Sequence, residues 1–491
     1  MTMTKSFTID WQKLIGFIAG PLVFFILLPI IPDSFISPSA GKVLSLAAWI
    51  IIWWMTEAVP IAITALLPLV LFPFMGVMKM NEAAAPYANP IVFLFMGGFM
   101  IALGLEKHRL HERIALNLIK ITGTSGNGII LGFMISTAFI SMWISNTATA
   151  MMMLPIALSV INLLKSDPSA SNDLLPKGER NFAIGLLLIV GYGSSIGGIG
   201  TIIGTPPNVV FAGLLDQFYH RKLDFGKWML VGVPIMVLLL TSMYFLITRV
   251  LFKNGINKVR GSDELIKAKL QELGKLRKEE KLVMMIFCIT CLLWIFQQPI
   301  NILLKKEMLN DTNVAMMGGI LMFIVPVDWK QMSFLLKWTD TEKMAWGILI
   351  LFGGGLCLAQ GLSSAGIIQA VGAKIAASSP SVNWLIFGLI VTAVFITELM
   401  SNVALVQIFL PVVFGIATNL GIDPILMGMP VTIGASMAFM FPVATPPNAI
   451  VFSSGHMKMN HMMKAGIWLN LISITLIYLA SVTLMRWVYG S

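Results

Sequence analysis

Long apolar runs separated by short polar stretches dominate the chain. Runs such as 14–31, 228–250 and 467–488 reach the roughly 17–25 apolar residues that a helix needs to span a bilayer. A soluble protein could bury one or two such helices but not about a dozen. The first run is too long for the apolar core of a secretory signal peptide, and more spans follow it directly. We therefore predict an all-α polytopic membrane protein with about eleven transmembrane helices.

Two of the apolar runs are interrupted by a short polar cluster. The first interruption lies in "ISNTATAMMMLPIA" from Ile144, and the second in "MSNVALVQIFLPVV" from Met400. Each cluster separates two apolar arms, so each predicts a re-entrant helical hairpin that returns the chain to the side it came from. The hairpin tips are expected at 144–148 and 400–404.

Three motifs occur twice in the same order. "FMGGFMIALGLE" pairs with "FGGGLCLAQGLS", the two polar clusters pair with each other, and "GTPPNVVFAG" pairs with "ATPPNAIVFSSG". This order indicates an internal duplication of the kind found in transporters. The expected organisation is an N-terminal helix at 1–41, a first repeat at 42–252 with an unwound loop at 204–208, a linker at 253–281, and a second repeat at 282–491 with an unwound loop at 444–448.

The charge pattern gives the repeats opposite orientations. Ten of the 33 Lys and Arg residues lie between Arg249 and Lys281, so the positive-inside rule places this linker, and by counting crossings the N-terminus, in the cytoplasm. After the first of the paired motifs stands "LEKHRLHER", whereas "LSSAGIIQA" follows the second. The loss of basic residues agrees with inverted repeats, and a multi-pass protein of the cell membrane is expected.

Composition excludes several other classes of protein. The chain is 57% hydrophobic and 11% charged, against roughly 25% charged residues in an average soluble domain. The net charge of +10 is concentrated in the linker without an aromatic or base-reading module, so nucleic-acid binding is not expected. Cys288 and Cys291 lie in an apolar run and are expected to be core residues. The spans show neither a Ser–His nor a paired-Asp arrangement, so an enzyme is not expected, while a channel stays open.

A helix that breaks at membrane depth exposes backbone groups, each costing several kcal/mol unless water, protein or ligand satisfies them. The proline pairs that begin at Pro206 and Pro446 predict two further breaks, since proline removes a donor. None of the four breaks contains Lys or Arg. An anion bound there must be held by helix dipoles, hydroxyls and amides, with its charge balanced by cations such as sodium. The alternative is that Ser, Asn and Thr only cap kinked helices.

The pairs "SNT"/"SNV" and "GTPPN"/"ATPPN", together with "WWMTEAVPIAITALLP" from Trp53, resemble the divalent anion:sodium symporter family of dicarboxylate and citrate carriers. The similarity covers essentially the whole chain. It implies eleven spans with two re-entrant hairpins, a homodimer, and an elevator mechanism in which a transport domain moves against a fixed scaffold.

The resemblance also implies roles for individual residues. Residues matching the substrate-binding positions are Ser145, Asn146, Thr147, Thr205, Pro206, Ser401, Asn402, Val403, Thr445 and Pro446. One sodium site would use Ser141, Ser145, Asn146 and Gly204. The other would use Thr397, Met400, Asn402 and Ala444, with Met400 and Ala444 contributing only backbone carbonyls. Val403 stands where many relatives carry Thr, so one hydroxyl is missing from the second tip.

The resulting prediction is a sodium-coupled symporter of dicarboxylates or tricarboxylates such as succinate, malate, fumarate or citrate, with no organic cofactor. A sodium-independent dicarboxylate exchanger of the same fold is the alternative, and a channel or intramembrane enzyme is remote. Glu398 is a further candidate because intramembrane carboxylates are often functional. It could serve a cation site, carry a proton or form a structural hydrogen bond.

Overall fold

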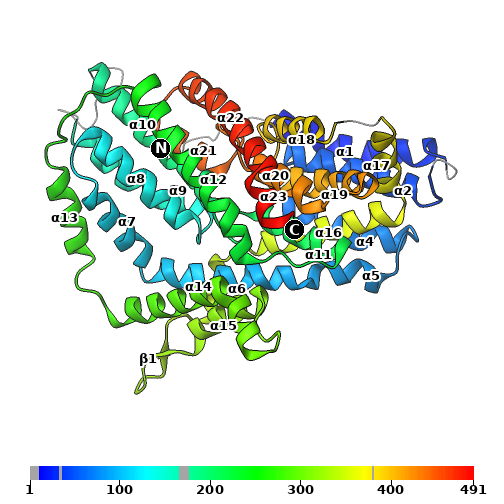
Figure 1. The fold of residues 1–491 in the computed structure, drawn as a ribbon, viewed down its shortest axis with the longest axis horizontal. Coiled ribbons are helices and arrows are strands. Elements are labelled where there is room, and N and C mark those ends of the chain that lie inside the picture. Colours follow the sequence, from blue (N-terminus) through cyan, green and yellow to red (C-terminus); the bar gives the residue numbers. More distant parts are fainter. Residues whose placement is uncertain (1–9, 33–35, 165–175, 379–380, 491) are drawn as a thin grey trace, which may run out of the picture.

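The computed structural model describes residues 10–32, 36–164, 176–378 and 381–490. Apart from one two-stranded hairpin, the described chain is helical (Figure 1). Eight helical segments are long and apolar enough to cross a membrane, and shorter apolar helices accompany them. If each broken helix counts as one span, the described helices group into about eleven spans and two hairpins. The structure is that of an all-α membrane protein, as predicted.

The helices before the first hairpin form two groups. The first group packs at the right of Figure 1 and comprises α1 (Trp11–Ile30), α2 (Ala40–Thr56), α3 (Ile61–Thr64), α4 (Leu67–Phe74), α5 (Met80–Ala84) and the 3₁₀ turn η1 (Ala85–Ala88). The second runs along the lower edge and to the left as α6 (Pro90–Lys107) and α7 (Leu110–Ile121). A proline at the first position of α6, capped by the Asn89 side chain, fixes where this helix begins.

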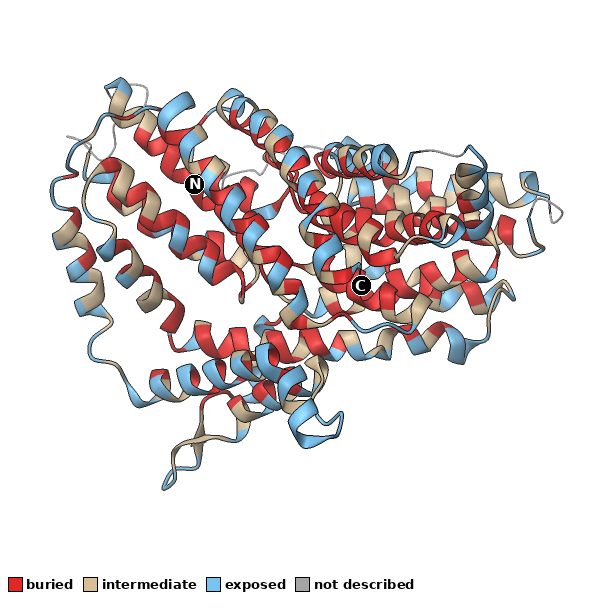
Figure 2. Cartoon of the chain, viewed as in Figure 1, coloured by how far each residue is buried: buried red, intermediate tan, exposed pale blue. Residues whose placement is uncertain are grey.

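The first half then continues through the hairpin and a broken helix. Its elements are α8 (Gly126–Ser141), α9 (Asn146–Asn162), α10 (Lys177–Gly198), α11 (Pro206–Tyr219), α12 (Phe225–Phe245) with a π-helical end η3 (Leu246–Leu251), and the linker helix α13 (Ser262–Glu272). The long helix α10 is buried from Phe182 to Gly198 and packs against α8 and α9 (Figure 2). It forms the centre of this part of the core.

The second half repeats the order with different lengths. It comprises α14 (Lys278–Leu304), α15 (Asp311–Ile324), the antiparallel strands β1 (Pro326–Asp328) and β2 (Ser333–Phe334), the 3₁₀ turn η4 (Trp338–Lys343), α16 (Trp346–Ser364), α17 (Ile367–Ala377), α18 (Val382–Ile396), α19 (Asn402–Leu420), α20 (Pro424–Ala435), α21 (Pro446–Ser453), α22 (Met459–Val482) and α23 (Leu484–Tyr489). Helices α14 and α15 lie with α6 at the lower edge of Figure 1, where the strand hairpin projects. Packing of α6 on α15 is close because a Cβ at Gly97 would collide with the Ala315 backbone.

The four breaks lie earlier than the sequence analysis placed them. The hairpin breaks occupy 142–145 and 397–401, and the unwound segments occupy 199–205 and 436–445. The expected tips at 144–148 and 400–404 and the expected loops at 204–208 and 444–448 are therefore corrected. The reason is local: a serine forms the N-cap of each second arm, and each proline pair occupies the first two positions of the following helix.

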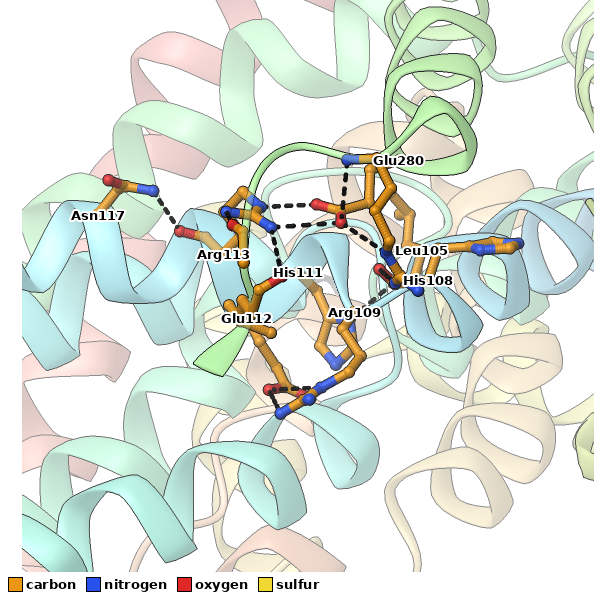
Figure 3. A network of polar contacts seen from close by, with 11 residues as sticks. Leu105, His108, Arg109, His111, Glu112, Arg113, Asn117 and Glu280 are labelled. Carbon is orange, nitrogen blue, oxygen red and sulfur yellow. Dashed lines mark hydrogen bonds and ion pairs between the residues drawn. The ribbon is translucent and has the colours of Figure 1, made fainter. Parts of the chain in front are cut away.

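An ionic network holds the start of α7 against the start of α14 (Figure 3). The Arg113 Nε lies 2.6 Å from Glu280 Oε2, and the Arg277 Nε lies 3.1 Å from Glu280 Oε1. The Glu280 carboxylate is buried, with 2% of its side chain exposed. The Arg109–Glu112 pair beside it is more exposed. Helix α7 buries only one face, and the network anchors its first turns to α14.

Candidate functional site

The first candidate cation site forms where α8 ends and α9 begins. Ser141, fully buried at the end of α8, donates from Oγ to the Ser194 carbonyl oxygen at 2.6 Å. The same hydroxyl lies 2.8 Å from Oδ1 of Asn146, the first residue of α9. Ser145 caps α9 by accepting a hydrogen bond from the Ala148 amide at 3.3 Å. The break thus places two polar side chains against α10.

Four oxygens converge at this point. The Asn146 side-chain atom that faces the Ser141 hydroxyl also lies 3.0 Å from the Ser194 carbonyl oxygen and 3.2 Å from the Gly204 carbonyl oxygen. With the amide oxygen in this position, the four oxygens share only one hydrogen between them. Such an arrangement is satisfied either by turning the amide so that its NH₂ donates, or by a cation among the oxygens. Hard oxygen ligands of this kind suit sodium, so the residues present fit a sodium ion.

The second hairpin repeats this construction in part. The Thr397 hydroxyl lies 2.8 Å from Asn402 Oδ1 and 2.7 Å from the Ala435 carbonyl oxygen, matching the contacts of Ser141. The structure thus brings Thr397 and Asn402 together as expected. Met400 and Ala444, the other residues expected here, have no recorded hydrogen bond to Asn402 within the described residues. Their role as cation ligands stays a prediction.

The two unwound segments share a second device. Asn208 donates to the carbonyl oxygens of Gly198 (3.2 Å) and Thr201 (2.8 Å), closing the segment before α11. Asn448 donates in the same way to carbonyl oxygens of the second segment, at 3.0 and 3.1 Å. Both asparagines are fully buried. They are the last residues of the motifs "GTPPN" and "ATPPN". Sequence reasoning assigned neither asparagine a role, although both motifs were identified.

The residues expected to hold substrate lie at the edges of these breaks. Residues 145–147 and 401–403, expected to contact substrate, are partly exposed, whereas Thr205 and Thr445 are buried at the N-cap positions of α11 and α21. Asn146 Nδ2 lies 3.5 Å from the Thr205 hydroxyl, which joins the first tip to the first unwound segment. Pro206 and Pro446 begin the following helices. At the second tip, the residues expected to contact substrate are Ser401, Asn402 and Val403.

The second arm of each hairpin packs against a broken helix of the other half. Helix α9 lies against α21, and α19 lies against α11. The four breaks therefore belong to one interlocked set of helices, although they come from distant parts of the sequence.

Comparison with known proteins identifies the family. A family model described as "sodium:sulfate symporter transmembrane region" matches residues 10–490. The chain belongs to this family. The match confirms the resemblance to divalent anion:sodium symporters. A protein named sodium-dependent dicarboxylate transporter SdcS from Staphylococcus saprophyticus is 38% identical, with 99% of this chain and 93% of that protein covered. Proteins of the same name from Staphylococcus aureus are also 38% identical, over 97% of this chain and 92% of theirs.

Solved structures support the fold of this sodium:sulfate symporter family member. The Alcanivorax borkumensis YdaH transporter aligns with a TM-score of 0.56 at 13% identity, covering 96% of this chain and 98% of YdaH. The Neisseria gonorrhoeae MtrF structure aligns with a TM-score of 0.55 at 14% identity, covering 83% and 84%. At these identities the similarity concerns the fold alone: an all-α transporter.

In this family member the two halves differ beside the hairpins. Glu398, which follows Thr397, is 2% exposed and accepts hydrogen bonds from three consecutive backbone amides, those of residues 439–441, at 2.7–3.3 Å. Asn470 Nδ2 in α22 donates to the same carboxylate at 2.7 Å. All these contacts are donors, so the carboxylate acts only as an acceptor, as an ionised group does. The hydrogen bonds go to the unwound segment rather than to the hairpin.

The corresponding place in the first half is apolar. Met142 follows Ser141, and Met142 and Met236 both pack on Gly200 of the first unwound segment. Met236 lies four residues after Gly232, just as Asn470 lies four residues after Gly466, and each of these glycines meets an unwound segment so closely that a Cβ would collide with a carbonyl oxygen. Sequence reasoning missed Asn470, because its role depends on where α22 crosses the second segment.

No group of three or more His, Cys, Asp or Glu side chains that could hold a metal occurs among the described residues. A cavity of about 700 Å³ opens elsewhere and reaches this region only at Ile202 in the first unwound segment; no hairpin-tip residue lines it. The exposed Glu57 ends α2, far from these contacts in the sequence.

Proposed function

We propose that this protein is a sodium-coupled symporter of dicarboxylate anions, not an enzyme. The observation that carries the proposal is the convergence of the Ser141 hydroxyl, the Asn146 side-chain amide and the carbonyl oxygens of Ser194 and Gly204. This oxygen set fits a sodium ion. The relatives named sodium-dependent dicarboxylate transporter, at 38% identity over nearly the full chain, support the substrate class.

The substrate would be held without a basic side chain. The four breaks contain no Lys or Arg, so carboxylates would be bound by the N-termini of α9 and α19 and by neighbouring hydroxyls and amides. Sodium ions would balance the negative charge, so binding of the ions and of the anion would depend on one another. The residues proposed for substrate contact are Ser145, Asn146, Thr147, Thr205, Pro206, Ser401, Asn402, Val403, Thr445 and Pro446.

Larger-scale features are proposed with the mechanism. The hairpins and broken helices would move as one transport domain against the group around α6, α14 and α15, as in an elevator. The protein would work as a homodimer in the cell membrane, with its N-terminus and the basic linker helix α13 in the cytoplasm. The two inverted repeats and their boundaries, at 42–252 and 282–491, belong to this proposal.

Uptake of labelled succinate into proteoliposomes tests the function. We expect uptake into empty vesicles under an inward sodium gradient and little uptake with potassium in its place. Uptake that ignores sodium but needs internal malate would establish the exchanger instead. Because Val403 supplies no hydroxyl at the second tip, we compare succinate, malate and citrate in the same assay. A Thr205→Ala, Thr445→Ala double variant with normal uptake would refute the substrate-site assignment without affecting the fold.

A further inference from the structure

The 700 Å³ cavity lies at the end of the molecule that the proposed topology places outside the cell. It is bordered by the start of α6, the end of α11, the start of α12, the end of α14 and the turn into α15. The residues that matter for its chemistry are Asp224, which caps α12, Gln297 in α14, and Asp311, the first residue of α15. None of them belongs to the hairpins or unwound segments of the transport site.

Three oxygens beside this cavity lack hydrogen-bond partners. They are Oδ2 of Asp224, Oδ1 of Asp311 and Oε1 of Gln297, and each is shielded from solvent and accepts no hydrogen bond from the described residues. The Gln297 side chain belongs to a residue only 6% exposed. A buried polar atom without a hydrogen-bond partner destabilises a folded protein. Three such atoms in one place indicate a group that they bind together.

The three side chains lie near one another. The Asp311 carboxylate interacts with the charge of Asp224 and approaches the Gln297 side chain and the Phe225 backbone. Tyr489 in α23, whose hydroxyl also lacks a described partner and which is 9% exposed, interacts electrostatically with both carboxylates. The N-termini of α12 and α15 and the C-terminal part of α14 therefore place Asp224, Asp311 and Gln297 along the same cavity.

The charge at this location is not balanced by an ion pair within the described residues. Asp224 uses Oδ1 to cap α12, accepting from the Lys227 amide at 2.7 Å, and its Oδ2 is left over. The exposed Lys222 interacts with Asp311 at long range but forms no salt bridge with it. Two neighbouring carboxylates repel each other, and a cation bound between them offsets this repulsion.

We propose that Asp224, Asp311 and Gln297 form a binding site for a divalent cation of the calcium class. Two carboxylates neutralise a divalent charge, and carboxylate and amide carbonyl oxygens are ligands that Ca²⁺ takes, with water completing its six to eight contacts. The cavity supplies the water. This site is separate from the proposed sodium sites and does not depend on which anion is transported.

A cation bound here would connect the first residues of α12 and α15 with α14. Asp224 precedes α12, which packs with α22, α10 and α14, whereas Gln297 and Asp311 belong to α14 and α15, which pack with α6. Occupancy would therefore stabilise the arrangement seen in this structure. The thermal stability of the protein should rise with calcium.

Terbium luminescence tests the site directly, because Tb³⁺ replaces Ca²⁺ and is excited by nearby tryptophan. The Trp294 indole donates to the Asp311 backbone carbonyl at 3.1 Å, so it lies next to the proposed site. In the purified protein we expect saturable Tb³⁺ emission that Ca²⁺ displaces at lower concentration than Mg²⁺ or Na⁺. Asp224→Asn and Asp311→Asn should each weaken Tb³⁺ binding by tenfold or more, and Gln297→Leu by a smaller factor.

Asp216→Asn is the matched control, since Asp216 lines the same cavity but is not among the oxygens without partners. It should bind Tb³⁺ as the unchanged protein does. Thermal unfolding gives a second readout: at the same Ca²⁺ concentration, the melting temperature of the unchanged protein and of Asp216→Asn should rise, and that of Asp224→Asn and Asp311→Asn should rise much less. The proposal is overturned if Tb³⁺ emission does not saturate, or if Asp216→Asn weakens it as much as Asp224→Asn and Asp311→Asn do. It is also overturned if Ca²⁺ leaves the melting temperature of the unchanged protein unaltered, as expected if the two carboxylates share a proton.

Discussion

Removing the Ser141 hydroxyl is the sharpest test of the proposed first sodium site. The side chain is fully buried, and its Oγ lies 2.6 Å from the Ser194 carbonyl oxygen and 2.8 Å from Asn146 Oδ1. Ser141→Ala removes one atom and creates little space, so helix packing should be retained. The variant takes away one of four converging oxygens and the donor that orients the Ser194 carbonyl.

The expected size of the effect follows from this loss. A hydrogen bond to a charged group contributes roughly 1.5–3 kcal/mol, and each 1.4 kcal/mol changes an equilibrium constant about tenfold. The sodium concentration for half-maximal succinate uptake should therefore rise about tenfold to a hundredfold. At saturating sodium, the maximal rate should fall much less, because the substrate-contacting residues are unchanged.

Ser136→Ala provides the matched control on the same helix. Its hydroxyl is equally buried and donates to the Ala115 carbonyl oxygen at 3.1 Å, away from the hairpin tip. It should lower stability without changing the sodium dependence of uptake. If both variants show the same sodium dependence, or if Ser141→Ala leaves it unaltered, the assignment of this oxygen cluster to sodium is wrong.

Two further substitutions, each with a control, test the role of the Glu398 carboxylate and the ionic network at the start of α7. Glu398→Gln replaces one acceptor oxygen by an NH₂ group that faces backbone donors, so at least one charge-assisted hydrogen bond of roughly 1.5–3 kcal/mol is lost and the apparent melting temperature should fall clearly. Met142→Leu, at the corresponding place in the first half, should cost less than about 1.5 kcal/mol. Equal losses of stability in the two variants would argue against the role given to the carboxylate. Arg113→Ala removes one of the two arginines that pair with the buried Glu280 carboxylate and should cost roughly 1.5–3 kcal/mol. Arg109→Ala, which removes a more exposed pair, should cost at most about 1 kcal/mol. Indistinguishable melting curves would contradict this.

Much of the fold could be predicted because the membrane imposes simple rules. Apolar length predicted the spans, and the polar clusters near Asn146 and Asn402 predicted helical breaks that the structure contains. Even the corrected boundaries follow from readable signals. Ser145 and Ser401 are natural N-caps, and proline pairs favour the first positions of a helix rather than a loop.

The candidate site was only partly predictable. The proposed side-chain ligands Ser141 and Thr397 belong to the repeated motifs, but nothing in the side chains of Ser194 and Ala435 signals that their carbonyl oxygens contact these hydroxyls. A backbone ligand is fixed by where one helix passes another, which depends on the tertiary packing. The same applies to Tyr192, whose hydroxyl donates across the halves to the Phe439 carbonyl oxygen at 2.8 Å.

The difference between the two halves has a structural origin. The first unwound segment, 199–205, has seven residues, and the second, 436–445, has ten. The three additional residues bring backbone amides that no helix bonds, and each would cost several kcal/mol if left unpaired at membrane depth. The Glu398 carboxylate accepts hydrogen bonds from three consecutive amides in this segment, while Met142 suffices beside the shorter one. The buried charge is thus explained by the length of the break, and it stands one residue from Thr397, where a cation would benefit from it.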